Sequence, residues 1–436
     1  MPEGLEIVLA PERLDAGSPE ERACFGLFSV RLGATELTGG LDIFISGYRA
    51  GPLVSGYHAA EWFAWNWWRL RFEPRSTTPD WWRAHTMTAI GEGYSWPNLT
   101  IFSDGVRTAL LAKPSTRPDA KPFRYLGANP IILPSIQFET ALDIFIPRIL
   151  GRLREQGVSE TNLDQVWRDV LTERADVDMS KRRRLEALLG RGADEIEDDA
   201  IERLIADAES LGEGAVEELA AERAHGGSLL TADALAEMAI TSGVDANPRD
   251  AARLASSSQL PSAAEAPAWR LGTAAARVLR AQQGLGEEPI SNNRLAQMAA
   301  VQTLALQKDP EGATLSFALD RSANDGRVVL RSRWETGRRF ELARLLADRA
   351  IAPRAGRLHA ATRAYLYRQK MQRAFAAEFL SPFDAVDAML AGDYSGEAQA
   401  DVAEHFDVSP LTIRTLLVNH GRLEREGLDE DIGAAA

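Results

Sequence analysis

Two stretches decide the fold of this chain: R-R-F-E-L-A-R-L-L-A-D at residues 338–348 and Q-R-A-F-A-A-E-F-L-S-P at residues 372–382. Residues four apart lie on one face of a helix, so Arg344 and Asp348 are opposite charges at the spacing that pairs across one turn. Glu341 lies one turn earlier, and a Glu341–Arg344–Asp348 ladder is one interpretation. A solvated helix face is the other, because an exposed pair of this kind contributes only about 0.3–0.5 kcal/mol.

Both stretches resemble the core of the ImmA/IrrE family of zinc metallo-endopeptidases, and the resemblance covers about residues 268–425. In that family an R-F-x-L-A lead-in runs into H-E-x-x-H, and a downstream helix carries a zinc-binding Glu just before F-A-A-x-L-L-x-P. In this chain Arg344 and Asp348 stand at the two His positions, and Leu345 stands at the position of the catalytic Glu. The downstream Glu position falls among Gln369, Lys370 and Met371.

These replacements remove the chemistry of the motif. H-E-x-x-H works because two imidazoles on one helix face share a metal ion, with the intervening Glu as general base. An Arg repels Zn²⁺, and a Leu can neither accept a proton nor orient a water. The sequence therefore predicts no catalytic residue, no metal and no cofactor, with zinc expected only if displaced ligands exist. We expect a vestigial cleft in which Arg344 and Asp348 pair with each other; its predicted residues are Glu341, Arg344, Asp348, Met371, Phe375 and Glu378.

Composition limits the class of protein. The chain has 436 residues, a formal net charge of −14 and one cysteine, Cys24. The charge argues against a non-specific grip on nucleic acid, because that grip neutralises phosphates with Lys and Arg. A single cysteine excludes an intramolecular disulfide. The most apolar stretch, residues 54–72, contains charged residues that a bilayer disfavours. We expect a cytoplasmic protein without a membrane partner.

The N-terminal part, residues 1–156, is predicted to be a β-rich domain, and it holds seven of the ten tryptophans. Residues 57–71 have no Gly or Pro and predict one helix. Its polar and aromatic side chains suggest a pocket walled by indoles, and the candidate residues are His58, Glu61, Trp65, Asn66 and Arg69. The alternative is that the tryptophans are core and the polar groups satisfy buried donors.

The remaining chain is predicted to be mostly helical, with a helical connector at residues 157–265 and the ImmA/IrrE-like domain at residues 266–436. Two strands joined by a turn are expected near residues 315–331. The fold class is α+β: a tryptophan-containing N-terminal domain, a helical middle and a mostly α, zincin-like domain with a small sheet. Residues 400–417 have helix–turn–helix spacing, with Ser409 as N-cap and Pro410 at the first helical position. This pair either packs on the core or reads DNA.

Three functions remain open at this point. The first is a non-catalytic relative of ImmA/IrrE peptidases that uses the retained fold as a protein-binding or sensing module. Because family members cleave a helix–turn–helix repressor, the resemblance implies a protein partner, with such a regulator as the candidate. The second is an active zinc-dependent endopeptidase with displaced ligands. The third is a DNA-binding transcriptional regulator.

Overall fold

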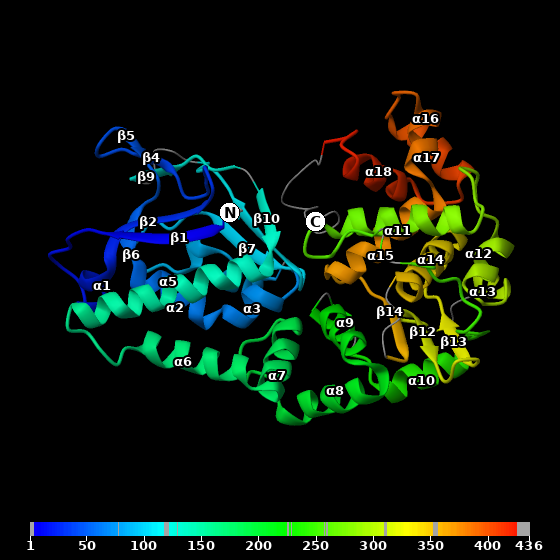
Figure 1. The fold of residues 1–436 in the computed structure, drawn as a ribbon, viewed down its shortest axis with the longest axis horizontal. Helices are drawn as coiled ribbons and strands as arrows, with labels where there is room; N and C mark the ends of the chain where they lie inside the picture. The colour runs from blue at the N-terminus through cyan, green and yellow to red at the C-terminus, as the bar shows by residue number, and fades with distance from the viewer. Residues whose placement is uncertain are drawn as a thin grey trace. The chain divides into compact units, whose positions relative to one another are not determined.

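The computed structural model describes residues 4–424 except 77, 117–121, 129, 225, 228, 257, 259, 309–311 and 352–355. The chain forms two compact units, Met1–Ile196 and Glu197–Ala436. Each combines helices with small antiparallel sheets, so the predicted α+β class is confirmed (Figure 1). None of the helices in the described ranges combines the length and apolar composition that crossing a bilayer demands.

The boundary between the units differs from the predicted boundaries near residues 156 and 265. Helices α6 (Asn162–Ala175) and α7 (Val177–Leu188) lie in the N-terminal unit, where Trp167 on α6 joins the buried core. Helices α8 (Asp198–Leu211), α9 (Glu213–Ala224) and α10 (Ala232–Thr241) lie in the C-terminal unit. The predicted connector is therefore divided between the two units, because α6 and α7 contribute side chains to the core of the N-terminal unit, whereas α9 and α10 contact strands of the sheet in the C-terminal unit.

The N-terminal unit is built on three antiparallel sheets, ordered β1-β2-β3 with β6 beside β2, β10-β8-β7, and β5-β4-β9. The strands are β1 (Leu5–Pro11), β2 (Phe25–Leu32), β3 (Thr35–Glu36), β4 (Gly40–Asp42), β5 (Gly47–Arg49), β6 (Leu53–Ser55), β7 (Leu99–Ser103), β8 (Arg107–Ala112), β9 (Phe123–Tyr125) and β10 (Pro130–Pro134). The remaining helices are α1 (Pro19–Cys24), α2 (Gly56–Trp65), α3 (Trp67–Phe72), α4 (Pro79–His85), the 3₁₀ helix η1 (Met87–Ala89) and α5 (Ser135–Glu155).

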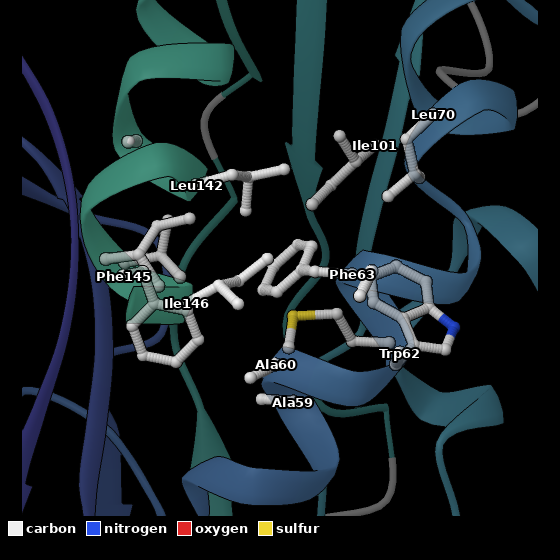
Figure 2. Packing of buried hydrophobic residues seen from close by; sticks show 14 of the residues in the cluster. Ala59, Ala60, Trp62, Phe63, Leu70, Ile101, Leu142, Phe145 and Ile146 are labelled. Atoms are coloured by element: carbon white, nitrogen blue, oxygen red, sulfur yellow. The ribbon is translucent and has the colours of Figure 1, made fainter. Parts of the chain in front are cut away.

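Helices α2 and α5 form the centre of this unit's core. Phe63 on α2 meets Phe145 on α5 edge to face, with ring centroids 6.2 Å apart. Figure 2 shows Phe63 among Ile146 from α5, Ile101 from β7 and Leu70 from α3. The helix predicted at residues 57–71 is interrupted at Asn66, whose side chain donates to the Trp62 carbonyl (2.9 Å). This local bond competes with helix continuation, which is why the two pieces form separate helices.

The C-terminal unit is organised around a four-stranded antiparallel sheet with the order β11-β13-β12-β14. The strands are β11 (Val244–Ala246), β12 (Ser316–Asp320), β13 (Gly326–Val329) and β14 (Leu358–Ala361). The helices after α10 are α11 (Ala268–Gln282), α12 (Asn292–Met298), α13 (Leu304–Gln307), α14 (Glu335–Ile351), α15 (Tyr367–Leu380), α16 (Phe383–Leu390), α17 (Gly396–His405) and α18 (Pro410–Asn419). The two strands expected near residues 315–331 are β12 and β13.

Helix α15 is almost entirely buried, and helix α11 packs so closely against it that the backbones of the two helices are in contact. A Cβ added at Gly272 of α11 would lie 2.4 Å from the Met371 carbonyl oxygen, so only glycine permits this contact. Helix α14 packs against α15 and against β14 (Figure 1). The two stretches that resemble the peptidase core are therefore neighbours in space, and Leu342, Leu345 and Phe375 from them share one apolar core.

Candidate functional site

Helix α14 directs both degenerate motif positions into the interior of the C-terminal unit. Arg344 is 5% exposed and Asp348 is 3% exposed. Since both lie on one face of the helix, they meet β14 and the first turns of α15. The solvated helix face considered from the sequence is therefore wrong. Two opposite charges have been taken out of water, a step that is costly unless each finds its own partners.

Arg344 and Asp348 do not bond to each other, so the predicted pair is also wrong. Arg344 Nη2 donates to the carbonyl of Thr362 (2.6 Å) and to Gln369 Oε1 (2.5 Å). Asp348 accepts from both Nε and Nη2 of Arg368, a bidentate contact from α15. The planar guanidinium of Arg368 approaches from the facing helix and engages both oxygens of the carboxylate.

His359 on β14 completes the environment of Asp348, and its Nδ1 lies 2.6 Å from Asp348 Oδ2. On its other side, His359 Nε2 lies 3.4 Å from Asp320 Oδ2, and Asp320 also accepts from Arg349. The result is a chain of alternating charge, Arg349–Asp320–His359–Asp348–Arg368, which links α14, β12, β14 and α15. We call this set of five residues the buried charge chain.

Burial and charge act in opposite directions on the acid–base groups of the chain. Burial disfavours ionised Asp348, but Arg368 and His359 outweigh it and hold the pKa of Asp348 well below its usual range. Burial disfavours the imidazolium of His359, but Asp320 and Asp348 outweigh it and raise the pKa of His359. For Arg344, burial and nearby Arg373 lower the pKa to about 9, which leaves the guanidinium charged at neutral pH.

The side chains at the motif positions do not fit a zinc ion. Three motif positions do converge, because Gln369 from the region of the expected third ligand bonds directly to Arg344. However, Arg344 offers only donors, and Gln369 is also occupied by the backbone N–H of Thr362 (2.9 Å). Asp348 is saturated by Arg368, His359 and Gln372 Nε2 (3.2 Å). Within the described residues, no group of three or more His, Cys, Asp or Glu is placed to hold a metal ion.

The six residues of the predicted cleft are all buried, between 0% and 8% exposed, but they do not form one site. Arg344 and Asp348 make the contacts described above. Met371 and Phe375 are packing residues of α15. Glu341 accepts from the Ser332 N–H (3.1 Å) rather than from Arg344. Glu378 lies further along α15 and accepts from Arg277 Nε (2.7 Å) of α11. The six residues therefore do not line an opening that a substrate could enter.

Helix α9, from the predicted connector, covers this region. Glu222 accepts from the backbone N–H of Arg363 (2.6 Å) and from its Nε (2.8 Å), directly after edge strand β14. Glu218 lies 3.5 Å from the hydroxyl of Thr362, and the Gly214 carbonyl lies 3.4 Å from Arg368 Nη1. Both glutamates are buried. An acidic helix thus contacts Arg363 and Arg368 beside the motif positions, and no local sequence pattern indicated this contact.

The predicted pocket of the N-terminal unit is dispersed. His58 Nε2 lies 3.5 Å from Glu21, whereas Glu61 accepts from Tyr57 and from Asn162 (2.7 Å). Trp65 is 63% exposed, and Asn66 bonds to the backbone at the helix interruption. Only Arg69 enters a buried polar cluster, and it does so with partners that were not predicted.

That cluster is Arg69, Glu73 and His85. Glu73 accepts from Arg69 Nε (2.6 Å) and lies 3.0 Å from His85 Nε2. His85 is fully buried, stacks on Trp81 at 4.4 Å and contacts the Ile101 carbonyl through Nδ1 (2.7 Å). Burial disfavours ionised Glu73, but His85 and Arg69 outweigh it and lower the pKa of Glu73. With every polar atom of the imidazole engaged, the cluster is a structural element of the core.

The helix pair α17–α18 begins its second helix as predicted, with the Ser409 side chain accepting from the Thr412 N–H (3.2 Å). Its apolar side chains, among them Val402, Ile413 and Leu417, belong to the core of the C-terminal unit, and α18 packs on α15 and α16. This contact favours the packing interpretation over DNA reading.

The residues that sequence reasoning missed are Arg368, His359, Glu218 and Glu222. One signal in the sequence could have identified Arg368. A buried Asp requires a cationic partner, and Arg368 lies in the first turn of α15, the helix that packs on α14. Searches of protein-family models, of curated proteins and of solved structures find no match to this chain.

Proposed function

We propose that this chain is a non-catalytic relative of the ImmA/IrrE peptidases and acts as a protein-binding, regulatory module. The observation that carries the proposal is the set of buried polar contacts made by Arg344, Gln369 and Asp348, of which Asp348 belongs to the buried charge chain. Arg344 and Asp348, at the two His positions of the family, and Gln369, one of three residues at the expected third position, converge from α14 and α15. Arg344 Nη2, the Asp348 carboxylate and the Gln369 amide are bonded to protein groups, and the Arg344–Gln369 and Asp348–Arg368 contacts join the two helices.

Catalysis is the less favourable alternative on the chemistry of these side chains. Leu345, at the position of the general base, is 2% exposed and packs in the core. A peptidase would have to break the contacts of Asp348 with Arg368 and His359 and expose both to a metal. Breaking a buried pair costs about 3–5 kcal/mol before any metal is bound.

A binding role is supported by what remains accessible near α14. Trp334, directly before α14, is 78% exposed. Tryptophan is enriched among residues that dominate binding energy at protein interfaces. The partner under this proposal is a protein, with a helix–turn–helix regulator as the candidate that the resemblance supplies.

The test is capture of a partner from an extract of the source cells by the immobilised full chain. Wild type and Ile240→Ala should enrich the same intact protein, and Trp334→Ala should lose it; Ile240 is a matched control because it is 64% exposed on α10. A partner retained by all three chains would contradict the use of this surface. Zinc-dependent cleavage of the captured protein by the purified chain would contradict the non-catalytic assignment.

A further inference from the structure

A cavity of about 470 Å³ opens on the C-terminal unit beside β12 and the start of β14, away from the motif positions. Four arginines line it: Arg249, Arg253, Arg321 and Arg357. This concentration of cations does not follow from composition, because the chain as a whole carries a formal net charge of −14. Like charges that share a cavity repel one another unless an anion lies between them.

The arginines of the cavity are available to a ligand. Arg249, Arg253 and Arg321 are exposed, and within the described residues none of their guanidinium groups is paired with a carboxylate. Arg357 is oriented by one hydrogen bond, from its Nε to the Asp320 carbonyl (2.9 Å), which leaves its two terminal nitrogens for a ligand. Guanidinium forks of this kind match phosphate oxygens bidentately.

One carboxylate, Asp320, also lines the cavity, and it is already neutralised. It accepts from Arg349 and lies 3.4 Å from the imidazole of His359, as part of the buried charge chain. It therefore does not cancel the positive charge of the four arginines. Ser322 adds a hydroxyl to the lining, and that hydroxyl can donate to an anion.

We infer that this cavity binds a small anion carrying two or more phosphate groups. A diphosphate carries more charge and more acceptor oxygens than a single sulfate or carboxylate, so it can engage more of the four guanidinium groups at once. The volume lies within the range of ordinary small-molecule sites, so it leaves room for a further group attached to the phosphates. The site is independent of the protein-binding surface proposed above.

Isothermal titration of the full chain with inorganic pyrophosphate at low ionic strength tests this inference. Wild type should bind one pyrophosphate per chain. The double variant Arg253→Ala with Arg321→Ala should bind about tenfold more weakly or worse, because two charge-assisted contacts are lost. The matched control is Arg203→Ala with Arg333→Ala, which removes the same charge from two exposed positions of the same unit outside the cavity and should bind like wild type.

All four substitutions lie at exposed positions, so the variants should fold like wild type, and unchanged melting temperatures without ligand verify this. Equal weakening in both double variants would overturn the inference, since the effect would then be long-range charge alone. Absence of a binding isotherm for wild type would overturn it as well. Sulfate binding as tight as pyrophosphate would overturn the assignment to a polyphosphate ligand.

Discussion

Replacing Asp348 with leucine should destabilise the C-terminal unit strongly. Which second substitution restores the lost stability then tests whether Arg368 is the partner of Asp348, as in the buried charge chain. Asp348→Leu leaves the guanidinium of Arg368, which is 7% exposed, without its carboxylate. Removing one member of a buried pair costs about 3–5 kcal/mol. For a unit of this size each kcal/mol lowers the melting temperature by about 2–4 °C, so the expected drop is about 6–20 °C.

Two double variants separate the observed network from the pairing expected from the sequence. Asp348→Leu with Arg368→Met removes both charges of the observed pair and should recover much of the loss, because an apolar pair of similar volume often replaces a buried ion pair without net cost. His359 keeps Asp320 as a partner in that variant. Asp348→Leu with Arg344→Met makes the same types of substitution but leaves Arg368 unpaired, and it should recover little.

The assay is differential scanning calorimetry of the full chain, with hydrogen exchange on peptides from α14 and α15 to assign the affected transition to the C-terminal unit. The melting temperature should be highest for wild type and lower for the double variant Asp348→Leu with Arg368→Met. It should be lowest, and about equal, for the double variant Asp348→Leu with Arg344→Met and for the single variant Asp348→Leu. Equal melting temperatures for the two double variants would refute the assignment of Arg368 as the partner of Asp348.

Three further outcomes follow from the same contacts. His359 has a raised pKa, so its stabilising charge is fully present below about pH 6.5 and is lost as the pH rises through its folded pKa. The difference in unfolding free energy between wild type and His359→Asn, measured by urea titration, should therefore narrow with rising pH. A difference that stays constant with pH would contradict this. Glu222→Gln should increase hydrogen exchange at the Arg363 amide and along α9. The control Glu209→Gln, on the exposed side of α8, should leave exchange at both places unchanged. Equal protection in wild type and both variants would mean that Glu222 does not fix α9 against the residue after β14. Random duplex DNA should bind with a Kd of roughly 10⁻⁴ M or above at physiological salt, whereas a gel shift at sub-micromolar protein that Arg414→Glu abolishes would favour the DNA-binding alternative.

The local elements were largely predictable, because their signals lie within a few residues of one another. The β7–β8 hairpin turns at Asp104 and Gly105 as its sequence indicates, and Ser409 caps α18. Predictions failed where one polar side chain redirected the backbone. Residues 41–45 alternate like a strand, but β4 covers only Gly40–Asp42. Asp42 accepts from the Phe44 N–H (2.9 Å) and turns the chain, which leaves Phe44 83% exposed.

The candidate site was predictable in position but not in connectivity. The motif alignment placed Arg344 and Asp348 on one helix face, and both do point to a common region. Their hydrogen-bond partners come from β14, from Thr362 directly after it and from α15, at separations of 11 to 25 residues. The choice between a partner one turn away and a guanidinium from another helix depends on tertiary packing, which a single sequence does not encode in any local pattern.

The most direct test of the central claim, that a structural charge network stands where a zinc site would be, is elemental analysis of the purified full chain. Protein expressed with added zinc and then dialysed should contain far less than one zinc per chain, and Asp348→Asn should not change that content. About one zinc per chain in wild type, lost in Asp348→Asn and in His359→Gln, would contradict the claim, because it would show that these side chains hold a metal.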